Sequence, residues 1–147
     1  MVLKEKPLDV NALVGLLPHR YPFLLVDYVN RCVPGDCIEG IKNLSKTEPN
    51  VRAGQGFCHL LVIEALAQLS VLLAFTSLHI TPQASDLTFF AGIDDASFGV
   101  VPRAGDRVHL SSRLVRIRKR IGWFDATASV EDRTVVLVTM IAAIRPS

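Results

Sequence analysis

The sequence is poor in the residues that cross-link small folds or hold metal ions. Among its 147 residues are three cysteines, Cys32, Cys37 and Cys58, and no two of them form a Cys-x-x-Cys pair. An odd number without that spacing predicts neither a disulfide framework nor a zinc site, and it favours a reducing, cytoplasmic location. The chain also has no glycine-rich phosphate loop, no Ser-His-Asp order and no cluster of metal ligands. We therefore expect no cofactor and no metal.

The chain also has little excess of either positive or negative charge. The net charge is +2, and no basic block is long enough to form a tail, so we predict no nucleic-acid partner. Charged and polar residues interrupt the N-terminal stretch MVLKEKPLDVNALVGL, which makes it a poor secretory signal. Apolar residues make up 50% of the chain, which leaves apolar surface for a second subunit. We expect a homo-oligomer.

One long apolar stretch, His59 to His79, dominates the chain. It is apolar on nearly every helical face, so a helix here must be buried all round. Its length prompts a comparison with a membrane span, but several polar residues inside it favour a core helix and no membrane partner. Glu64 and Gln68 lie one turn apart on one face. A buried carboxylate is costly unless it is paired or used, so Glu64 requires an explanation.

The rest of the chain predicts one short helix and a series of strands. We expect a helix over Asp9–Leu17, capped by Asp9 and ended by Pro18. The stretch from 47 to 56 contains one proline and two glycines and is predicted to be a loop. The predicted strands are Phe23–Val33, Cys37–Leu44, Leu87–Ile93, Arg107–Lys119, Ile121–Glu131 and Thr134–Ile144.

These elements predict an α+β fold in a single domain, residues 1–147. A hairpin, one long buried helix and an antiparallel meander require a sheet that curls around the helix. In Ile121–Glu131, apolar residues alternate with polar ones, so one face of that strand should be buried. Thr134–Ile144 is apolar on both faces, as expected for a central strand. One small sheet cannot wrap the helix completely, and a second copy would cover its open flank.

Four blocks carry a resemblance to a known family. They are LPHRYPFLLVD (Leu17–Asp27), VIEALAQ (Val62–Gln68), AGIDDASF (Ala91–Phe98) and the Pro-x-x-Gly-Asp step (Pro102–Asp106). In order and spacing they resemble the 3-hydroxyacyl-acyl carrier protein dehydratases of the FabZ type. The resemblance implies a dimeric hotdog fold, often a trimer of dimers, and an acyl-thioester substrate carried by acyl carrier protein or coenzyme A. It also implies active sites at the dimer interface.

The chain departs from this family at one catalytic position. The family uses a His in a Gly-His-Phe-Pro loop and a Glu in the helix, from opposite subunits. Glu64 lies in the matching helix motif, but the loop is shorter and contains no Gly-His-Phe-Pro. His59, at the helix start, is the replacement candidate, and on helical geometry it could meet only the Glu64 of another subunit. A helix-end or interface role for His59 stays open.

The resemblance implies an acid role for Glu64, with a pKa raised by its apolar surroundings. The alternative for Glu64 is a structural carboxylate held by Gln68 and backbone donors. We expect Gln68 to orient Glu64, and His19, Arg20 and Tyr21 to be architectural. The expected substrate contacts are Gln68, Phe57, Phe90, Ala91 and Gly92.

Basic residues cluster between positions 113 and 120, and Arg116, Arg118 and Arg120 are predicted to share a strand face. Such a face could dock an acidic carrier protein or could be a solvated sheet edge. Three functions stay open. The first is a dehydratase of fatty-acid or polyketide-type lipid metabolism with altered catalysis. The others are an acyl thioesterase and a non-catalytic partner of a catalytic homologue.

Overall fold

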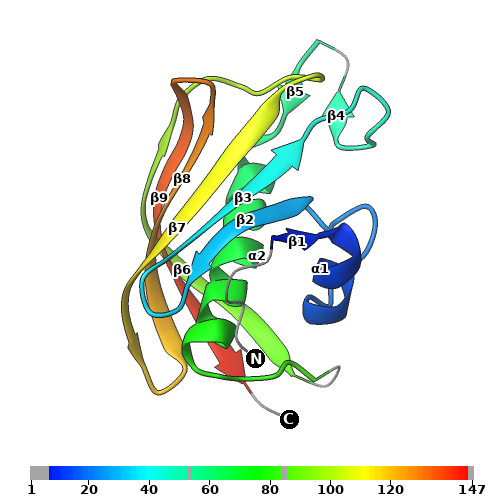
Figure 1. The fold of residues 1–147 in the computed structure, drawn as a ribbon. Coiled ribbons are helices and arrows are strands. Elements are labelled where there is room, and N and C mark those ends of the chain that lie inside the picture. Colours follow the sequence, from blue (N-terminus) through cyan, green and yellow to red (C-terminus); the bar gives the residue numbers. More distant parts are fainter. Residues whose placement is uncertain (1–6, 53, 84–85, 146–147) are drawn as a thin grey trace.

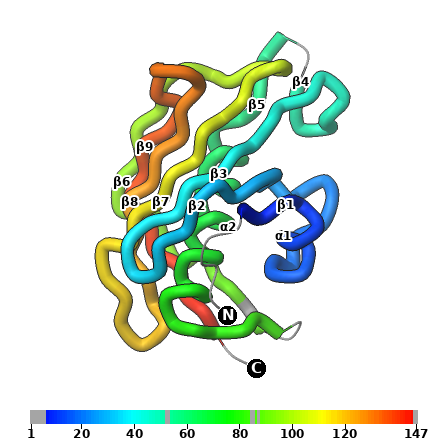
Figure 2. Tube along the Cα trace, viewed as in Figure 1, coloured from blue at the N-terminus to red at the C-terminus, as the bar shows by residue number. Residues whose placement is uncertain are grey.

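A computed structural model describes residues 7–52, 54–83 and 86–145. Its main feature is a seven-stranded antiparallel sheet with the order β1-β2-β3-β7-β8-β9-β6. The sheet curls around the long helix α2 (His59–Ser77), as Figures 1 and 2 show. The strands are β1 (Leu8–Asp9), β2 (Tyr28–Val33), β3 (Cys37–Asn43), β6 (Leu87–Phe98), β7 (Arg107–Arg118), β8 (Ile121–Val130) and β9 (Arg133–Arg145). The predicted α+β fold with one central helix is confirmed.

The helix α2 is the core of the molecule. It is long and apolar enough to cross a membrane, but 78% of its most apolar 18-residue window is buried inside the protein. Its buried hydroxyl groups have partners: Ser70 Oγ donates to Leu66 O and lies 2.7 Å from Ser112 Oγ. Thr76 Oγ1 donates to Leu72 O. Because these polar groups are satisfied, the helix can be enclosed on most sides without an energetic penalty.

The short helix α1 (Val10–Leu16) begins as predicted. Asp9 is its N-cap, and the Asp9 carboxylate accepts a hydrogen bond from Ala12 N at 3.0 Å. The helix ends next to Leu17, whose N–H donates to Leu13 O. In Figure 1, α1 lies to one side of α2, close to β1. This position delivers the following segment to the surface of α2.

The sheet confirms the predicted alternation of β8. The side chains Phe124, Ala126, Ala128 and Val130 are all buried against the core. The neighbouring strand β9 lies between β8 and β6, as a central strand should. Its inner face is buried, whereas Leu137 on the other face is exposed. The apolar outer face of β9 is therefore surface in a single chain.

Apart from shifts of one residue at element ends, four predictions differ from the structure. The strand expected from Phe23 begins at Tyr28, because Phe23 O and Leu25 N bond to the Gln68 side chain of α2, and the backbone meets β3 only at Asp27, whose N–H donates to Ile41 O. The strand predicted to end at Ile93 continues as β6 to Phe98 and pairs with β9, with register shifts after Phe90 and after Ile93. The predicted loop 47–56 contains β4 (Val51–Arg52), which pairs with β5 (Gly56–Phe57).

The fourth difference concerns the basic cluster. Arg120 does not share a strand face with Arg116 and Arg118, because it lies in the turn after β7 with a φ of 66°. Lys119 occupies the same turn with a φ of 49°. Arg116 lies over the Trp123 ring, with its guanidinium carbon 4.0 Å from the ring centroid. One member of the cluster is thus used in packing on the sheet.

Candidate active site

Gln68 anchors the segment after α1 to the middle of α2. Its side chain is 1% exposed, and its amide oxygen accepts a hydrogen bond from Leu25 N at 2.9 Å. Its amide nitrogen donates to Phe23 O at 2.7 Å. Both partners are more than 40 residues away in sequence. Gln68 therefore holds the stretch that carries the His-Arg-Tyr-Pro motif against the helix.

Glu64 lies one turn before Gln68, and its Oε1 atom receives two contacts. Gln68 Nε2 donates to Oε1 at 3.0 Å, and His19 Nε2 lies 3.2 Å from the same atom. The Oε2 atom has no hydrogen bond to any residue that the structure describes. The Glu64 side chain is 37% exposed in the single chain, so it is half-buried and not enclosed as its apolar sequence context predicted.

The direction of the Glu64 pKa follows from competing causes. Burial raises it, whereas the hydrogen bonds from His19 and Gln68 and the charge of His19 lower it, and the net result is a lowered pKa. This direction is opposite to the raised pKa that we expected for a proton donor. Two donors directed at one carboxylate oxygen favour the ionised form. Glu64 is thus a carboxylate at neutral pH.

A cavity of about 160 Å³ opens beside this pair. Its apolar lining includes Phe89 and Phe90 of β6. Its lining residues are His19, Glu64, Ala67, Gln68, Val71, Thr88, Phe89, Phe90 and Ala142. Among them, only His19 and Glu64 can ionise near neutral pH. The cavity therefore places one carboxylate and one imidazole beside apolar side chains.

His59, the predicted base, lies elsewhere in the single chain. Its Nε2 atom is 3.1 Å from Val100 O, and its ring packs on Phe98 with 5.3 Å between centroids. It lines a separate, open cavity of about 390 Å³ together with Phe57 and Cys58. The structure thus does not bring His59 to the Glu64 of its own chain, in agreement with the helical geometry.

The other predicted contacts divide between the two cavities. Gln68 and Phe90 line the cavity at Glu64, whereas Phe57 lines the cavity at His59. Ala91 and Gly92 lie at an irregularity of β6, where its register against β9 shifts, and they line neither cavity. No group of three His, Cys, Asp or Glu side chains in the described part of the chain is arranged to hold a metal ion.

His19 is the site residue that sequence reasoning missed. We expected an architectural role for it, yet it contacts the carboxylate that the helix motif identifies. The available signal was the motif LPHRYPFLLVD itself, which contains the one histidine of the N-terminal region. Pattern alone could not pair His19 with Glu64, because the contact depends on how Gln68 binds the intervening segment.

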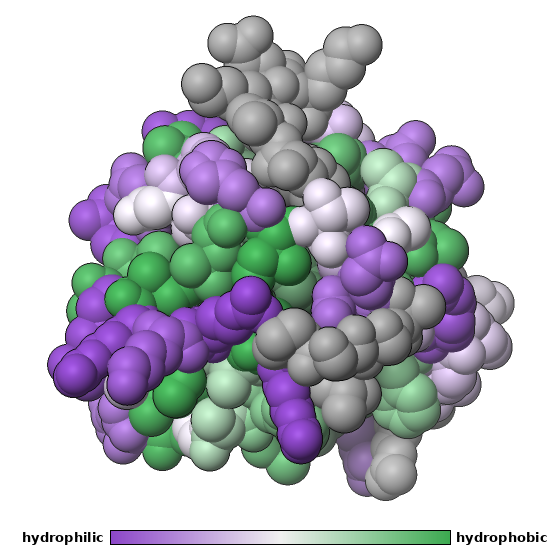
Figure 3. Space-filling model, turned by 90° about the horizontal axis from the view of Figure 1, so that it is seen from below, coloured by the Kyte–Doolittle hydropathy of each residue, from purple (hydrophilic) through white to green (hydrophobic). Residues whose placement is uncertain are grey.

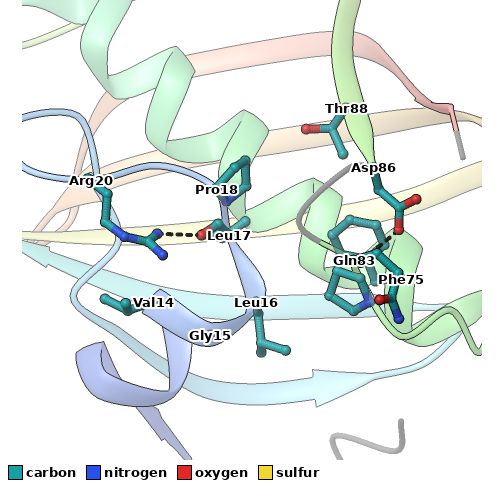
Figure 4. Close-up of a pocket in the computed structure, with 11 residues that line it drawn as sticks. Val14, Gly15, Leu16, Leu17, Pro18, Arg20, Phe75, Gln83, Asp86 and Thr88 are labelled. Carbon is teal, nitrogen blue, oxygen red and sulfur yellow. Dashed lines mark hydrogen bonds between the residues drawn. The ribbon is translucent and has the colours of Figure 1, made fainter. Parts of the chain in front are cut away.

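A third cavity, of about 270 Å³, lies next to the cavity at Glu64. The two share Thr88 in their lining, and Phe75 of α2 lies in the third (Figure 4). Figure 4 shows Leu17 and Arg20 on one side of this space and Asp86 and Thr88 on the other. Arg20 Nη1 donates to Leu17 O at 2.8 Å, which holds the loop wall in place.

One face of α2 contributes lining residues to both of these cavities. Glu64, Gln68, Val71 and Phe75 follow at helical spacing and line one cavity or the other. At a rise of about 1.5 Å per residue, this face extends roughly 16 Å from Glu64 to Phe75. The arrangement suits an elongated ligand with its reactive end at Glu64.

A curled antiparallel sheet around one long helix, with a carboxylate on that helix facing a cavity, defines the chain as a hotdog protein. The FabA-like domain family matches residues 17–139, and the chain belongs to this family. It is 35% identical over 142 residues to a 3-hydroxyacyl-[acyl-carrier-protein] dehydratase FabZ of Shewanella loihica, with coverage of 94% of this chain and 93% of the relative. The corresponding protein of Psychrobacter arcticus is 38% identical over 146 residues, with coverages of 93% and 97%.

Solved structures show the same fold at low sequence identity. The dehydratase heterocomplex ApeI:P from Xenorhabdus doucetiae matches with a TM-score of 0.79 and 16% identity, over 92% of this chain and 91% of that chain. A mutant thioesterase from Pseudomonas aeruginosa matches with a TM-score of 0.68 and 12% identity, over 95% and 96%. These likenesses support the hotdog architecture.

Proposed function

We propose that this protein is a FabZ-like dehydratase that removes water from a 3-hydroxyacyl thioester carried by acyl carrier protein or coenzyme A. Relatives that are named for this reaction are 35% to 38% identical over nearly the whole chain. The observation that carries the proposal is the position of Glu64. It lies at a cavity with an apolar lining, held by His19 and Gln68, in the motif that the family resemblance assigns to catalysis.

The chemistry of dehydration fits this cavity. A base must take the proton from Cα and an acid must protonate the hydroxyl that leaves Cβ, both within hydrogen-bond reach. Glu64 provides an ionisable group at that place, and Phe89 and Phe90 contribute apolar lining beside it. The acyl chain would extend along the α2 face past Val71 towards Phe75.

The proposal includes a homodimer. The strand β6 ends the sheet order, so one of its edges has no partner strand among the described residues. It exposes Phe89, Phe90, Ile93 and Phe98. Figure 3 shows a further area of apolar residues gathered on the face seen from below. A second copy at β6 would cover the edge and close the cavity near Phe90.

Hydration of a crotonyl thioester, the reverse reaction, tests the proposal. We expect loss of the enoyl absorbance with wild type, on the coenzyme A or the carrier-protein thioester. The Glu64→Gln variant should be slower by about 10²-fold or more, because the reacting carboxylate is gone. Glu39→Gln is the matched control, since Glu39 is an exposed carboxylate on β3. Absence of turnover by wild type on both carriers would refute the proposal.

Hydrolysis of the thioester is the second candidate. One carboxylate can activate a water molecule, and the unbonded Oε2 of Glu64 is positioned to do so. Hotdog neighbours of this chain include a protein named as a thioesterase. Release of free thiol from acyl-coenzyme A, without formation of an enoyl product, would favour this function over dehydration.

A further inference from the structure

We propose that Glu64 itself accepts the α-proton of the substrate through Oε2 and returns it to the leaving hydroxyl, with His19 of the same chain as a positioning residue. This inference rests on the proposed dehydratase function. It differs from the division of labour that the resemblance implies, in which a loop histidine is the base and the helix glutamate is the acid. Here one chain contains the whole proton-transfer apparatus.

The first observation concerns the two carboxylate oxygens. Both donors, His19 Nε2 and Gln68 Nε2, are directed at Oε1, at 3.2 Å and 3.0 Å. Gln68 is held by Leu25 N and Phe23 O, so it cannot turn away without breaking two buried hydrogen bonds. Oε1 is thus occupied by hydrogen bonds, and Oε2 is the oxygen left to accept a proton.

The second observation concerns His19. Its Nε2 faces the carboxylate and so carries the hydrogen. Its Nδ1 atom is buried, without a hydrogen-bond partner in the part of the chain that the structure describes. Nε2 thus lies at the carboxylate and Nδ1 is buried, so neither nitrogen of His19 is available to the substrate.

The third observation is the inventory of the cavity. His19 and Glu64 are its only lining residues that ionise near neutral pH, and the lining contributed by α2, β6 and β9 adds no other charge. His59 lines a different cavity. Since one ring nitrogen of His19 lies at the carboxylate and the other is buried, Glu64 is the one ionisable group in the lining of this cavity that can exchange protons with a bound substrate.

The reaction balances with this single group. Oε2 takes the α-proton, and the C–H electron pair forms the enolate of the thioester. The new carboxylic acid then protonates the β-hydroxyl on the same face of the substrate. As the C–O bond breaks, the enolate electrons form the C=C bond, water leaves, and Glu64 is a carboxylate again. No oxidant, metal or second base is required.

Three variants test the inference by kcat/KM for hydration of a crotonyl thioester across pH. His19→Leu should lose about 10²-fold, because the carboxylate loses a donor. In this variant, the acid limb of the pH profile of kcat/KM should also move to higher pH. The reason is that loss of the His19 hydrogen bond removes a cause that lowers the Glu64 pKa. His19→Gln, which keeps an N–H donor, should stay within about tenfold of wild type. His59→Gln should match wild type.

The outcomes separate this inference from the proposed function. If wild type hydrates crotonyl thioester but His19→Leu keeps the wild-type acid limb, His19 does not act on Glu64 and the inference is wrong. It is also wrong if His59→Gln abolishes turnover while His19→Gln and His19→Leu do not. An inactive wild type would instead refute the dehydratase function. Thermal unfolding of each variant identifies any that fail to fold. If His19→Leu fails to fold, the activity of His19→Gln relative to wild type tests the inference instead.

Discussion

Glu64 owes its ionisation to two neighbours and not to burial. Burial alone would raise its pKa, but the donors His19 and Gln68 reverse that direction. The same donors leave Oε2 unbonded, so the residue is both charged and available. A half-buried carboxylate beside an apolar cavity is a suitable group for proton transfer to or from carbon.

The lowered pKa makes Glu64 a pH-dependent contributor to stability. A carboxylate whose pKa is lower in the folded state stabilises the fold above its ordinary pKa of 4.5. That contribution is lost as pH falls through the folded-state pKa. We expect the difference in free energy of unfolding between wild type and Glu64→Gln to shrink when urea denaturation is repeated from pH 7 down to pH 3.5. A difference that stays constant over this range would contradict the assigned contacts.

Lys42 is a second residue whose charge is used inside the fold. Its side chain is buried, and Nζ lies 2.9 Å from a Glu48 oxygen and 3.4 Å from a carboxylate oxygen of Asp27. Asp27 belongs to the LPHRYPFLLVD motif and also accepts from Asn43 N. The cation therefore joins the end of that motif to the segment before α2.

We expect Lys42→Met to lower the free energy of unfolding by about 1–3 kcal/mol, because two partly buried carboxylates lose their partner. Urea denaturation at neutral pH measures the change. The exposed Lys46 supplies the control, and Lys46→Met should stay within about 0.5 kcal/mol of wild type. Equal effects of the two substitutions would show that the buried contacts contribute nothing.

The sequence pattern predicted some of the contacts of Glu64, but not all of them. The i,i+4 spacing of Glu64 and Gln68 in an apolar stretch was sufficient to predict that the two side chains meet, and they do. The contact with His19 spans 45 positions and depends on the Gln68 hydrogen bonds, so no local pattern encodes it. For the same reason the strand predicted from Phe23 was wrong: its backbone groups bond to a side chain of α2.

At the scale of elements, α2 is both the core and one wall of the ligand space. This helix was predictable because a stretch that is apolar on nearly every helical face must be buried on most sides. The alternating strands that follow form the sheet that buries it. The face that carries Glu64, Gln68, Val71 and Phe75 also borders two cavities that share Thr88, and on this face Glu64 is half-buried whereas the other three are buried. Neither cavity could be derived from the sequence, because both depend on the position of α1 and the loop after it.

This face predicts control of acyl chain length by Val71. A larger side chain there would fill part of the cavity beyond Glu64, so Val71→Phe should reduce kcat/KM for long-chain enoyl thioesters by about tenfold or more. Hydration of the crotonyl thioester should change little, because a short chain would end before Val71. Val71→Ala is the matched variant and should keep both activities. Equal losses for short and long chains would exclude a chain path along this face.

At the scale of the whole molecule, the sheet has a free edge at β6. The terminal strand β6 pairs with β9 on one side, and in the described residues no strand pairs with its other side. An unprotected edge of twelve residues with exposed aromatic side chains is a liability for a monomer. Exposed apolar side chains are therefore present on this strand, and their coverage by a second copy stays a prediction.

The edge predicts that a charge on β6 separates the subunits. Ile93 is 43% exposed on this strand, and Ile93→Lys should shift the protein from dimer to monomer in sedimentation velocity at micromolar concentration. Crotonyl-thioester hydration should fall with it, because the second copy would close the cavity beside Phe90. Leu137→Lys is the control, since Leu137 is 47% exposed on the internal strand β9, away from the free edge. If Ile93→Lys remains dimeric while Leu137→Lys dissociates, the subunits meet through the outer face of the sheet and not through β6.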